Sequence, residues 1–363
     1  MSMSSPNSAP QSLLQRLFKL QEHGTTVRTE LIAGVTTFLT MVYIIFVNPQ
    51  ILAAAHMDIK AVFVTTCLIA AFGSILMGLV ANLPIAVAPA MGLNAFFAFV
   101  VVGAMGYSWQ VAMGAIFWGA VGLFLLTLFR IRYWIIAHIP LSLRVGITSG
   151  IGLFIAMMGL KNSGIIIPNN DTIVTIGNFA SHNVLLGALG FFIIAILAAR
   201  NIHAAILISI IITTVIGLLL GDVQYQGIFD IPPSIAPVVG QVDIVGALDI
   251  GLSGVIFAFM LVNLFDSSGT LIGVTDKAGL TDDKGKFPQM KQALYVDSLS
   301  SVAGSAMGTS SVTAFIESTS GVSVGGRTGL TAVVVGILFL LAIFLSPLAG
   351  MVPSYATAGA LIY

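Results

Sequence analysis

The sequence contains little charge for its length. Lys, Arg, Asp and Glu make up 8% of its 363 residues, whereas a soluble domain has roughly 25%. Apolar residues account for 57% of the chain, and a soluble fold of this composition would leave large apolar areas facing water. The composition therefore predicts a protein that has the lipid bilayer as its solvent.

Several other features are scarce, and each scarcity excludes a class of protein. The single cysteine, Cys67, cannot form an internal disulfide. The net charge is zero and there is no basic tract, which argues against nucleic acid as a partner. The five histidines lie near the ends of apolar segments or in loops, without a metal-binding cluster or a hydrolase-type triad. We therefore expect no enzyme, no cofactor and no metal site.

Long apolar segments dominate what is present, and they predict an all-α polytopic membrane protein. Eleven of them could span ~30 Å of hydrocarbon, although Gly and Pro interrupt several. They lie near 31–54, 61–81, 84–105, 109–129, 143–160, 183–199, 203–220, 250–272, 292–307, 309–326 and 329–351.

Both ends of the chain differ from these segments. Residues 1–27 are polar, and Leu13, Leu14, Leu17 and Phe18 share one helical face, which predicts a tail with a short interfacial helix. A twelfth apolar segment starts near Pro353, and the sequence stops inside it. Carbonyls that end within hydrocarbon lack hydrogen-bond partners, so we expect a C-terminally truncated chain that lacks its last two to three spans.

The basic residues predict an orientation. With the N-terminus in the cytoplasm and each span crossing once, only Lys60 and Lys161 fall outside. The twelve that fall inside are Arg16, Lys19, Arg28, Arg130, Arg132, Arg144, Arg200, Lys277, Lys284, Lys286, Lys291 and Arg327. This asymmetry follows the positive-inside rule and supports the span count.

Two carboxylates lie within apolar spans, where a charge is costly and tends to mark a pathway. Asp266 lies midway along the eighth span and Glu317 lies in the tenth. The alternative for each is a hydrogen-bonded carboxylate that only holds helices together. Asp297 opens the ninth span beside a Lys-rich loop, and for it we expect an interfacial, structural role.

The third and tenth spans carry residues that break helices. Pro84, Pro89 and Gly92 precede Asn94 in the third span, and Gly308 to Thr313 precede Glu317 in the tenth. Proline frees backbone groups that lipid does not tolerate but a ligand cavity does. Matching broken segments in two halves predict a midplane binding site in an inverted-repeat transporter, where helix N-termini offer N–H groups to a substrate.

Four stretches of the sequence carry a family resemblance. They read RTELIAGVTTFLTMVYIIFVNPQIL, APAMGLNAFFAF, NLFDSSGTLIGV and FIESTSGVSVGGRTGLTA. These motifs resemble those of the nucleobase–cation symporters. Within that family they are most similar to the azaguanine-resistance-type purine permeases, and in that branch to the bacterial adenine permeases. The resemblance extends from about Leu17 to the last residue.

The resemblance implies fourteen spans in two inverted repeats of seven. Residues 28–225 would form the first repeat, in which spans 1–4 belong to a core domain and spans 5–7 to a gate domain. Residues 226–363 would form an incomplete second repeat, with core spans 8–11 and the start of span 12. Related carriers are often dimers, so a homodimer is one implied assembly.

The resemblance also implies a set of substrate-binding residues. Asn94 with Gly92 beside it matches the third-span motif, Asp266 the eighth-span acid and Glu317 the tenth-span acid. Thr313, in the interrupted segment of the tenth span, is a further candidate for the substrate site. A purine has adjacent donors and acceptors on its edges, which carboxylates, amides and backbone N–H groups can pair.

Two further assignments leave alternatives open. Phe96 and Phe265 are candidates to stack on the purine ring, with core packing as the alternative. Because burial favours the neutral form of a carboxyl group, Asp266 is the expected proton carrier and Glu317 the main ligand of the base. These two roles are exchangeable on the sequence alone.

The sequence thus predicts a permease of the inner membrane that takes up a purine base, most simply adenine, together with a proton. The first alternative is a guanine and hypoxanthine permease, because the residues that distinguish these bases cannot be read from one sequence. The second alternative is a truncated membrane fragment that does not transport.

Overall fold

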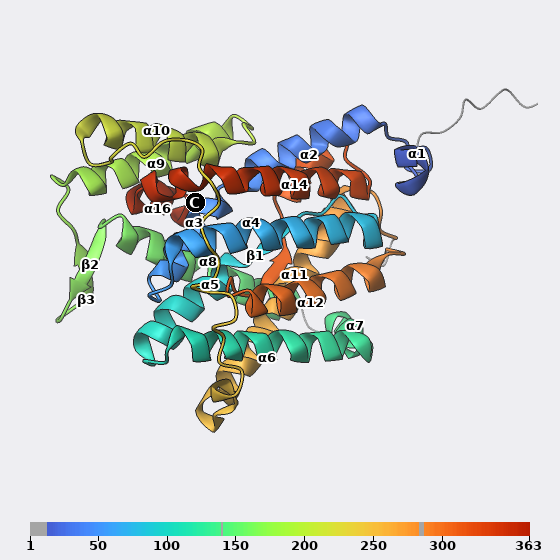
Figure 1. Cartoon of the computed structure of the whole chain (residues 1–363), viewed down its shortest axis with the longest axis horizontal. Helices are drawn as coiled ribbons and strands as arrows, with labels where there is room; N and C mark the ends of the chain where they lie inside the picture. The colour runs from blue at the N-terminus through green and yellow to red at the C-terminus, as the bar shows by residue number, and fades with distance from the viewer. Residues whose placement is uncertain (1–12, 139–140, 283–286) are drawn as a thin grey trace, which may run out of the picture.

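The computed structural model of the chain describes residues 13–138, 141–282 and 287–363, and in these residues it is mostly helical (Figure 1). Lys284 and Lys286, two of the charges in the orientation prediction, lie outside the described residues, as do residues 1–12 of the predicted tail.

Most helices and strands follow one another through short connections, and a long segment, residues 221–245, links α10 to η3. The elements up to residue 220 are α1 (Leu13–Leu17), α2 (Val27–Met41), α3 (Ile44–Ala53), α4 (Ile59–Leu76), η1 (Met77–Ala81), β1 (Val87–Pro89), α5 (Met91–Ala95), η2 (Phe96–Ala104), α6 (Trp109–Leu128), α7 (Ile131–His138), α8 (Leu141–Asn162), β2 (Ile166–Asn169), β3 (Ile173–Ile176), α9 (His182–Ala199) and α10 (Ala205–Leu220). The remaining elements are η3 (Gly246–Leu248), η4 (Ile250–Leu252), α11 (Ser253–Lys277), α12 (Met290–Ala306), β4 (Val312–Ala314), α13 (Ser318–Ser323), α14 (Gly329–Ala342), η5 (Ile343–Leu345), α15 (Ser346–Met351) and α16 (Ser354–Ile362).

Each predicted apolar segment corresponds to a helix or to an interrupted helix. Six helices in the described residues are long and apolar enough to cross a membrane, so the prediction of a polytopic helical membrane protein is confirmed in this coarser form. The count of eleven spans stays a prediction. The sequence did not indicate the short helix α7 or the hairpin that pairs β2 with β3.

The helices form two groups (Figure 1). In the first group α14 packs on α2 and α4, while α6 packs on α11 and α12. In the second group α16 packs on α8, α9 and α10. Figure 1 shows α9, α10 and α16 together at one end of the molecule, away from α6 and α7.

A short antiparallel pair of strands lies at the centre of the first group (Figure 1). β1 pairs with β4 in the register Val87 with Ala314, Ala88 with Thr313, and Pro89 with Val312. These strands interrupt the third and tenth predicted spans, where we expected broken helices. A residue with positive φ precedes each strand: Asn82 at φ 51° and Ser310 at φ 83°. Each of these residues lies between the preceding helix and the extended strand.

Serine side chains complete the hydrogen bonding of the two strands. Ser74 on α4 accepts the Val87 N–H at 3.0 Å, and Ser318 accepts the Ala86 N–H at 3.0 Å. On the other strand, Ser301 on α12 donates to the Val312 carbonyl at 2.6 Å. Because buried backbone groups are costly when they have no partner, these small hydroxyl residues allow extended backbone at the centre of a membrane protein.

A buried carboxylate, Glu30 on α2, caps the N-terminal end of α14. It accepts the backbone N–H of Arg327 at 2.9 Å and that of Thr328 at 3.3 Å. It also accepts the N–H of Thr331 at 3.3 Å and the Thr331 hydroxyl at 2.6 Å. The first N–H groups of a helix have no partner within the helix and favour a negative charge, so Glu30 fastens α14 to α2.

We predict that Glu30→Gln lowers the free energy of unfolding by about 1–3 kcal/mol, the usual range for losing a hydrogen bond to a charged group. Thermal unfolding of the purified protein in detergent measures the effect. Glu22→Gln is the matched control, because exposed Glu22 pairs only with exposed Lys19 at 3.5 Å and such surface pairs contribute about 0–1 kcal/mol. Equal melting temperatures for both variants would contradict the capping role.

Candidate functional site

One cavity of about 160 Å³ brings together four of the predicted site residues. Gly92 of α5, Asp266 of α11, Thr313 of β4 and Glu317 line it. Ile151 and Ile155 of α8 form its apolar side. Drug-sized ligands occupy roughly 300–1,000 Å³, so a cavity of this size suits a smaller molecule.

Gly92 sits where α5 approaches α8 closely. A Cβ atom added to Gly92 would lie 2.3 Å from Ile151 Cγ2, well inside van der Waals contact. The glycine therefore lets the helix that follows β1 meet α8 across the cavity. This contact joins the two groups of helices at the site.

Asp266 is half-buried midway along α11. The side chain of Thr313, on β4, lies within hydrogen-bonding reach of its carboxylate. Pairing of β4 with β1 fixes Thr313 opposite Ala88, so the strand pair positions the hydroxyl that faces Asp266. In the described part of the chain Asp266 has no basic partner among the ion pairs.

Glu317 is half-buried at the start of α13 and accepts a hydrogen bond from the Tyr43 hydroxyl at 2.6 Å. Tyr43 is buried at the break between α2 and α3. Tyr43 was not predicted as a site residue, because an aromatic residue in an apolar span gives no signal of a polar contact. Glu317 also lines a second cavity, of about 250 Å³, with Thr40 of α2 and His203 from the α9–α10 connection.

Asn94 does not line the cavity of Asp266 and Glu317. It is fully buried, and its amide Nδ2 donates to Asn48 Oδ1. Asn48 donates in turn to the hydroxyls of Thr66 at 2.8 Å and Thr309 at 3.2 Å. Asn94 Oδ1 has no hydrogen-bond partner among the described residues. The structure thus places Asn94 in a polar network behind the cavity, two residues after Gly92.

The two candidate stacking residues lie in the core. The ring of Phe96 packs edge-on against Phe259, with centroids 5.3 Å apart and an interplanar angle of 69°. Phe265 is buried in a cluster with Leu264 and Leu271. Neither ring lines the cavity of Asp266 and Glu317, so the structure favours the core-packing alternative for both.

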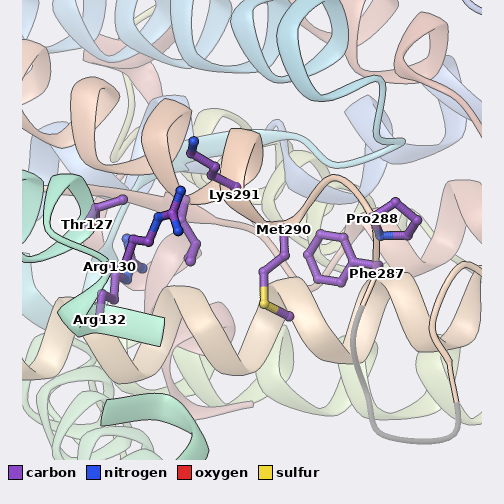
Figure 2. A pocket seen from close by; sticks show the side chains of 8 residues that line it. Thr127, Arg130, Arg132, Phe287, Pro288, Met290 and Lys291 are labelled. Carbon is purple, nitrogen blue, oxygen red and sulfur yellow. The ribbon is translucent and has the colours of Figure 1, made fainter. Parts of the chain in front are cut away.

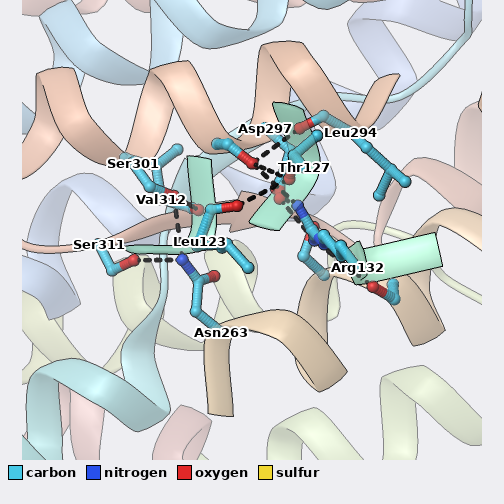
Figure 3. Close-up of polar contacts among 12 residues, drawn as sticks. Leu123, Thr127, Arg132, Asn263, Leu294, Asp297, Ser301, Ser311 and Val312 are labelled. Carbon is cyan, nitrogen blue, oxygen red and sulfur yellow. Dashed lines mark hydrogen bonds and ion pairs between the residues drawn. The ribbon is translucent and has the colours of Figure 1, made fainter. Parts of the chain in front are cut away.

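A further carboxylate, that of Asp297 on α12, is fully buried and forms an ion pair (Figure 3). Its Oδ2 lies 2.8 Å from Arg132 Nη2, and both side chains are fully buried. Ser267, the neighbour of Asp266 on α11, donates to Asp297 Oδ1 at 2.5 Å, and Arg132 Nη1 donates to Ser298 at 3.1 Å. Asp297 therefore has a partner of opposite charge, which agrees with the structural role predicted for it.

The sequence assigned Arg132 to the cytoplasmic side without indicating a partner for it. In the structure it lies in α7, and its side chain is buried against α11 and α12. The physical reason is the buried carboxylate of Asp297, since a buried charge requires a partner. Asp297 and Arg132 are 165 positions apart, so the sequence alone does not reveal the pair.

These features define the class of protein. The chain belongs to the Permease family, whose sequence model matches residues 28–363. It is therefore a multi-pass membrane permease and not an enzyme, as the sequence predicted.

Individual relatives are longer than this chain. It is 77% identical over 353 residues to the adenine permease AdeP of Escherichia coli (strain K12), covering 97% of this chain and 79% of that protein. It is 73% identical over 350 residues to the adenine permease AdeQ of the same strain, covering 96% of this chain and 79% of that protein. The family resemblance seen in the sequence is thereby confirmed.

The fold resembles that of a solved transporter. The transmembrane domain of the cyanobacterium bicarbonate transporter BicA superposes with a TM-score of 0.72, covering 92% of this chain and 87% of that domain. Because the two sequences are only 15% identical, the likeness concerns the fold alone.

We predict that breaking the Arg132–Asp297 pair destabilises the protein more than removing it. Asp297→Asn and Arg132→Met should each lower the free energy of unfolding by about 3–5 kcal/mol, because each leaves an uncompensated buried charge or donor. The double variant Arg132→Met, Asp297→Asn, which leaves no buried charge, should lose less free energy of unfolding than either single variant. Unfolding titrations in mixed micelles test this cycle, with exposed Asp276→Asn as control. Additive losses in the double variant would show that the pair is not coupled.

Proposed function

We propose that this chain takes up a purine base, adenine, together with a proton across the inner membrane of a bacterium. The observation that carries the proposal is the cavity that joins Asp266 and Glu317 beside the β1–β4 pair, in a chain so similar to two adenine permeases. Both carboxylates lie where the substrate of an interrupted-helix transporter binds.

The chemistry of the cavity suits a flat, neutral, polar ring. Carboxylates accept N–H groups, and adenine presents N–H donors on its edge. Gly92 lets α5 approach α8 closely, and Ile151 and Ile155 supply an apolar side of the cavity. Asn94 lies behind Gly92, its side-chain carbonyl oxygen has no hydrogen-bond partner among the described residues, and in this proposal it positions the α5 backbone at the cavity.

Proton coupling is the second part of the proposal. Asp266 and Glu317 are paired with hydroxyl groups, of Thr313 and Tyr43. A hydroxyl can donate to a carboxylate and accept from a carboxylic acid, so either protonation state of each acid keeps its partner. Asp266 is the proposed proton carrier and Glu317 the proposed main ligand of the base.

The packing of the helices supports the proposed domains. The chain would divide into a first repeat, residues 28–225, and the part of a second repeat in residues 226–363. Helices α8, α9, α10 and α16, which pack on one another, would form the gate, and α2–α6 with α11–α14 the core. The N-terminus would face the cytoplasm, and the assembly would be a homodimer.

Uptake of radiolabelled adenine tests the proposal in a strain that lacks purine-base permeases. We expect saturable uptake that is faster at acidic pH and abolished by an uncoupler. Asp266→Asn and Glu317→Gln should each reduce uptake roughly ten- to hundredfold, the loss expected when a hydrogen bond to a charged group disappears. Asp276→Asn, an exposed acid at the end of the same helix as Asp266, is the matched control.

A longer relative such as AdeP serves as the positive control, with immunodetection of every variant in the membrane. Competition by unlabelled adenine, guanine and hypoxanthine distinguishes an adenine permease from a guanine and hypoxanthine permease, since only the cognate base should suppress uptake at low concentration. Absence of uptake beside an active relative, with this chain present in the membrane, would overturn the proposal for this chain. It would support the non-transporting alternative.

Tyr43→Phe provides a finer test of the site. Removal of the hydroxyl leaves the ring but takes away the 2.6 Å hydrogen bond to Glu317. We expect a higher KM for adenine, by roughly two- to tenfold, because a hydrogen bond typically contributes about 0.5–1.5 kcal/mol. Tyr107→Phe, outside the cavity, is the control. An unchanged KM would show that Tyr43 does not position Glu317 for the substrate.

A further inference from the structure

A third cavity, distinct from both cavities at Glu317, lies at the end of α6 where α7 begins (Figure 2). It has a volume of about 360 Å³ and extends to the start of α12. Three basic side chains line it, those of Arg130, Arg132 and Lys291. This cavity and the one at Asp266 and Glu317 share no lining residue in the described part of the chain.

The charges of this cavity do not balance among the described residues. No carboxylate is among the described residues that line it. Asp297 neutralises Arg132 from behind, at 2.8 Å, whereas Arg130 and Lys291 are exposed and form no ion pair in the described ranges. The cavity therefore presents two positive charges to whatever enters it.

Arg132 gives an independent sign of a missing partner. Its side chain is fully buried, and its Nε has no hydrogen-bond partner among the described residues. Buried donors are normally satisfied by protein, water or an ion, and here the unsatisfied Nε belongs to a side chain that lines the cavity. Figure 2 shows Arg130 and Arg132 together on one side of the cavity, with Lys291 above them.

The surroundings place the cavity at the boundary of the hydrocarbon. α6 is one of the helices long enough to cross a membrane, and the cavity lies at its end. Next to the cavity, Phe129 is 68% exposed and Trp134 is 59% exposed, and Leu125 and Leu128 are exposed on the last turns of α6. Exposed aromatic residues at a span end are typical of the membrane–water interface.

We propose that this cavity binds a phosphate group, carried by the headgroup of an anionic phospholipid. Arg130 and Lys291 would contact the phosphate oxygens, because guanidinium and ammonium groups both bind phosphate well. The acyl chains would lie along Leu125 and Leu128 of α6. Basic pockets between spans bind such headgroups in the same way. The proposal does not depend on which substrate the permease transports.

The test uses the purified full chain in a neutral detergent, with three probes added separately: phosphatidylglycerol, phosphatidylcholine and inorganic phosphate. Thermal unfolding and native mass spectrometry report binding. Phosphatidylglycerol should raise the melting temperature and remain bound, whereas phosphatidylcholine should not. The variant Arg130→Gln, Lys291→Gln should bind phosphatidylglycerol roughly tenfold or more weakly, because each basic residue near an anionic headgroup contributes about 1 kcal/mol.

The matched control is Arg200→Gln, Lys277→Gln, which removes two exposed basic residues that do not line the cavity. Arg130→Lys keeps the positive charge but loses the planar guanidinium group. Its affinity for phosphatidylglycerol should therefore lie between those of the wild type and the double variant Arg130→Gln, Lys291→Gln. An unchanged melting temperature without lipid and a single elution peak show that each variant is folded.

The outcomes separate the sources of the phosphate. The lipid site is supported if phosphatidylglycerol no longer binds to and stabilises the variant Arg130→Gln, Lys291→Gln but still binds to and stabilises the control variant Arg200→Gln, Lys277→Gln. An effect of inorganic phosphate, lost in the same variant, supports a phosphate site that a soluble ion fills. An equal phosphatidylglycerol effect in both double variants, or no effect of either phosphate probe, overturns the proposal.

Discussion

The structure depends on one constraint: extended backbone at the centre of a membrane protein must find its hydrogen-bond partners within the protein. β1 and β4 meet this constraint by pairing with each other across more than two hundred residues of sequence. Ser74, Ser301 and Ser318 satisfy groups that the strand pair leaves over. Without these contacts each unpaired group would cost several kcal/mol, roughly 2–7 by transfer data. The pairing therefore holds the two interrupted spans, at β1 and at β4, side by side.

The candidate site follows from that pairing. Because Thr313 lies in β4 and Gly92 just after β1, the strand pair carries one lining residue from each half of the chain to a single cavity. α11 adds Asp266 from the side, and Glu317 follows β4 directly. The apolar wall comes from α8, which belongs to the other group of helices. A shift of one group against the other would thus reshape the cavity without breaking the strand pair, and this is the physical reason why a carrier suits the geometry.

The sequence predicted those features that depend on local chemistry. Proline and glycine marked the interruptions at β1 and β4, and the cost of a charge in lipid singled out Asp266 and Glu317. Contacts between distant residues were not predictable. Arg132 resembled one loop charge among many until the fold placed it beside Asp297, and neither Tyr43 nor Asn48 carries a local signal of its partner. For the same reason Asn94 and Phe96 were expected in the cavity, although tertiary packing turns one toward Asn48 and the other toward Phe259.

Asp297, Asp266 and Glu317 differ in a way that separates a structural carboxylate from the two of the proposed transport site. Asp297 faces a guanidinium at 2.8 Å, and protonation of Asp297 would leave Arg132 buried without a counter-charge, which is strongly unfavourable. Asp266 and Glu317 face hydroxyls instead, and a hydroxyl reverses its hydrogen bond when the acid gains a proton. Ser267 donates to Asp297 from the position next to Asp266, so the Arg132–Asp297 pair holds the segment of α11 that carries Asp266. In the proposed proton coupling, this ion pair would keep Asp266 in place while the charge of Asp266 changes.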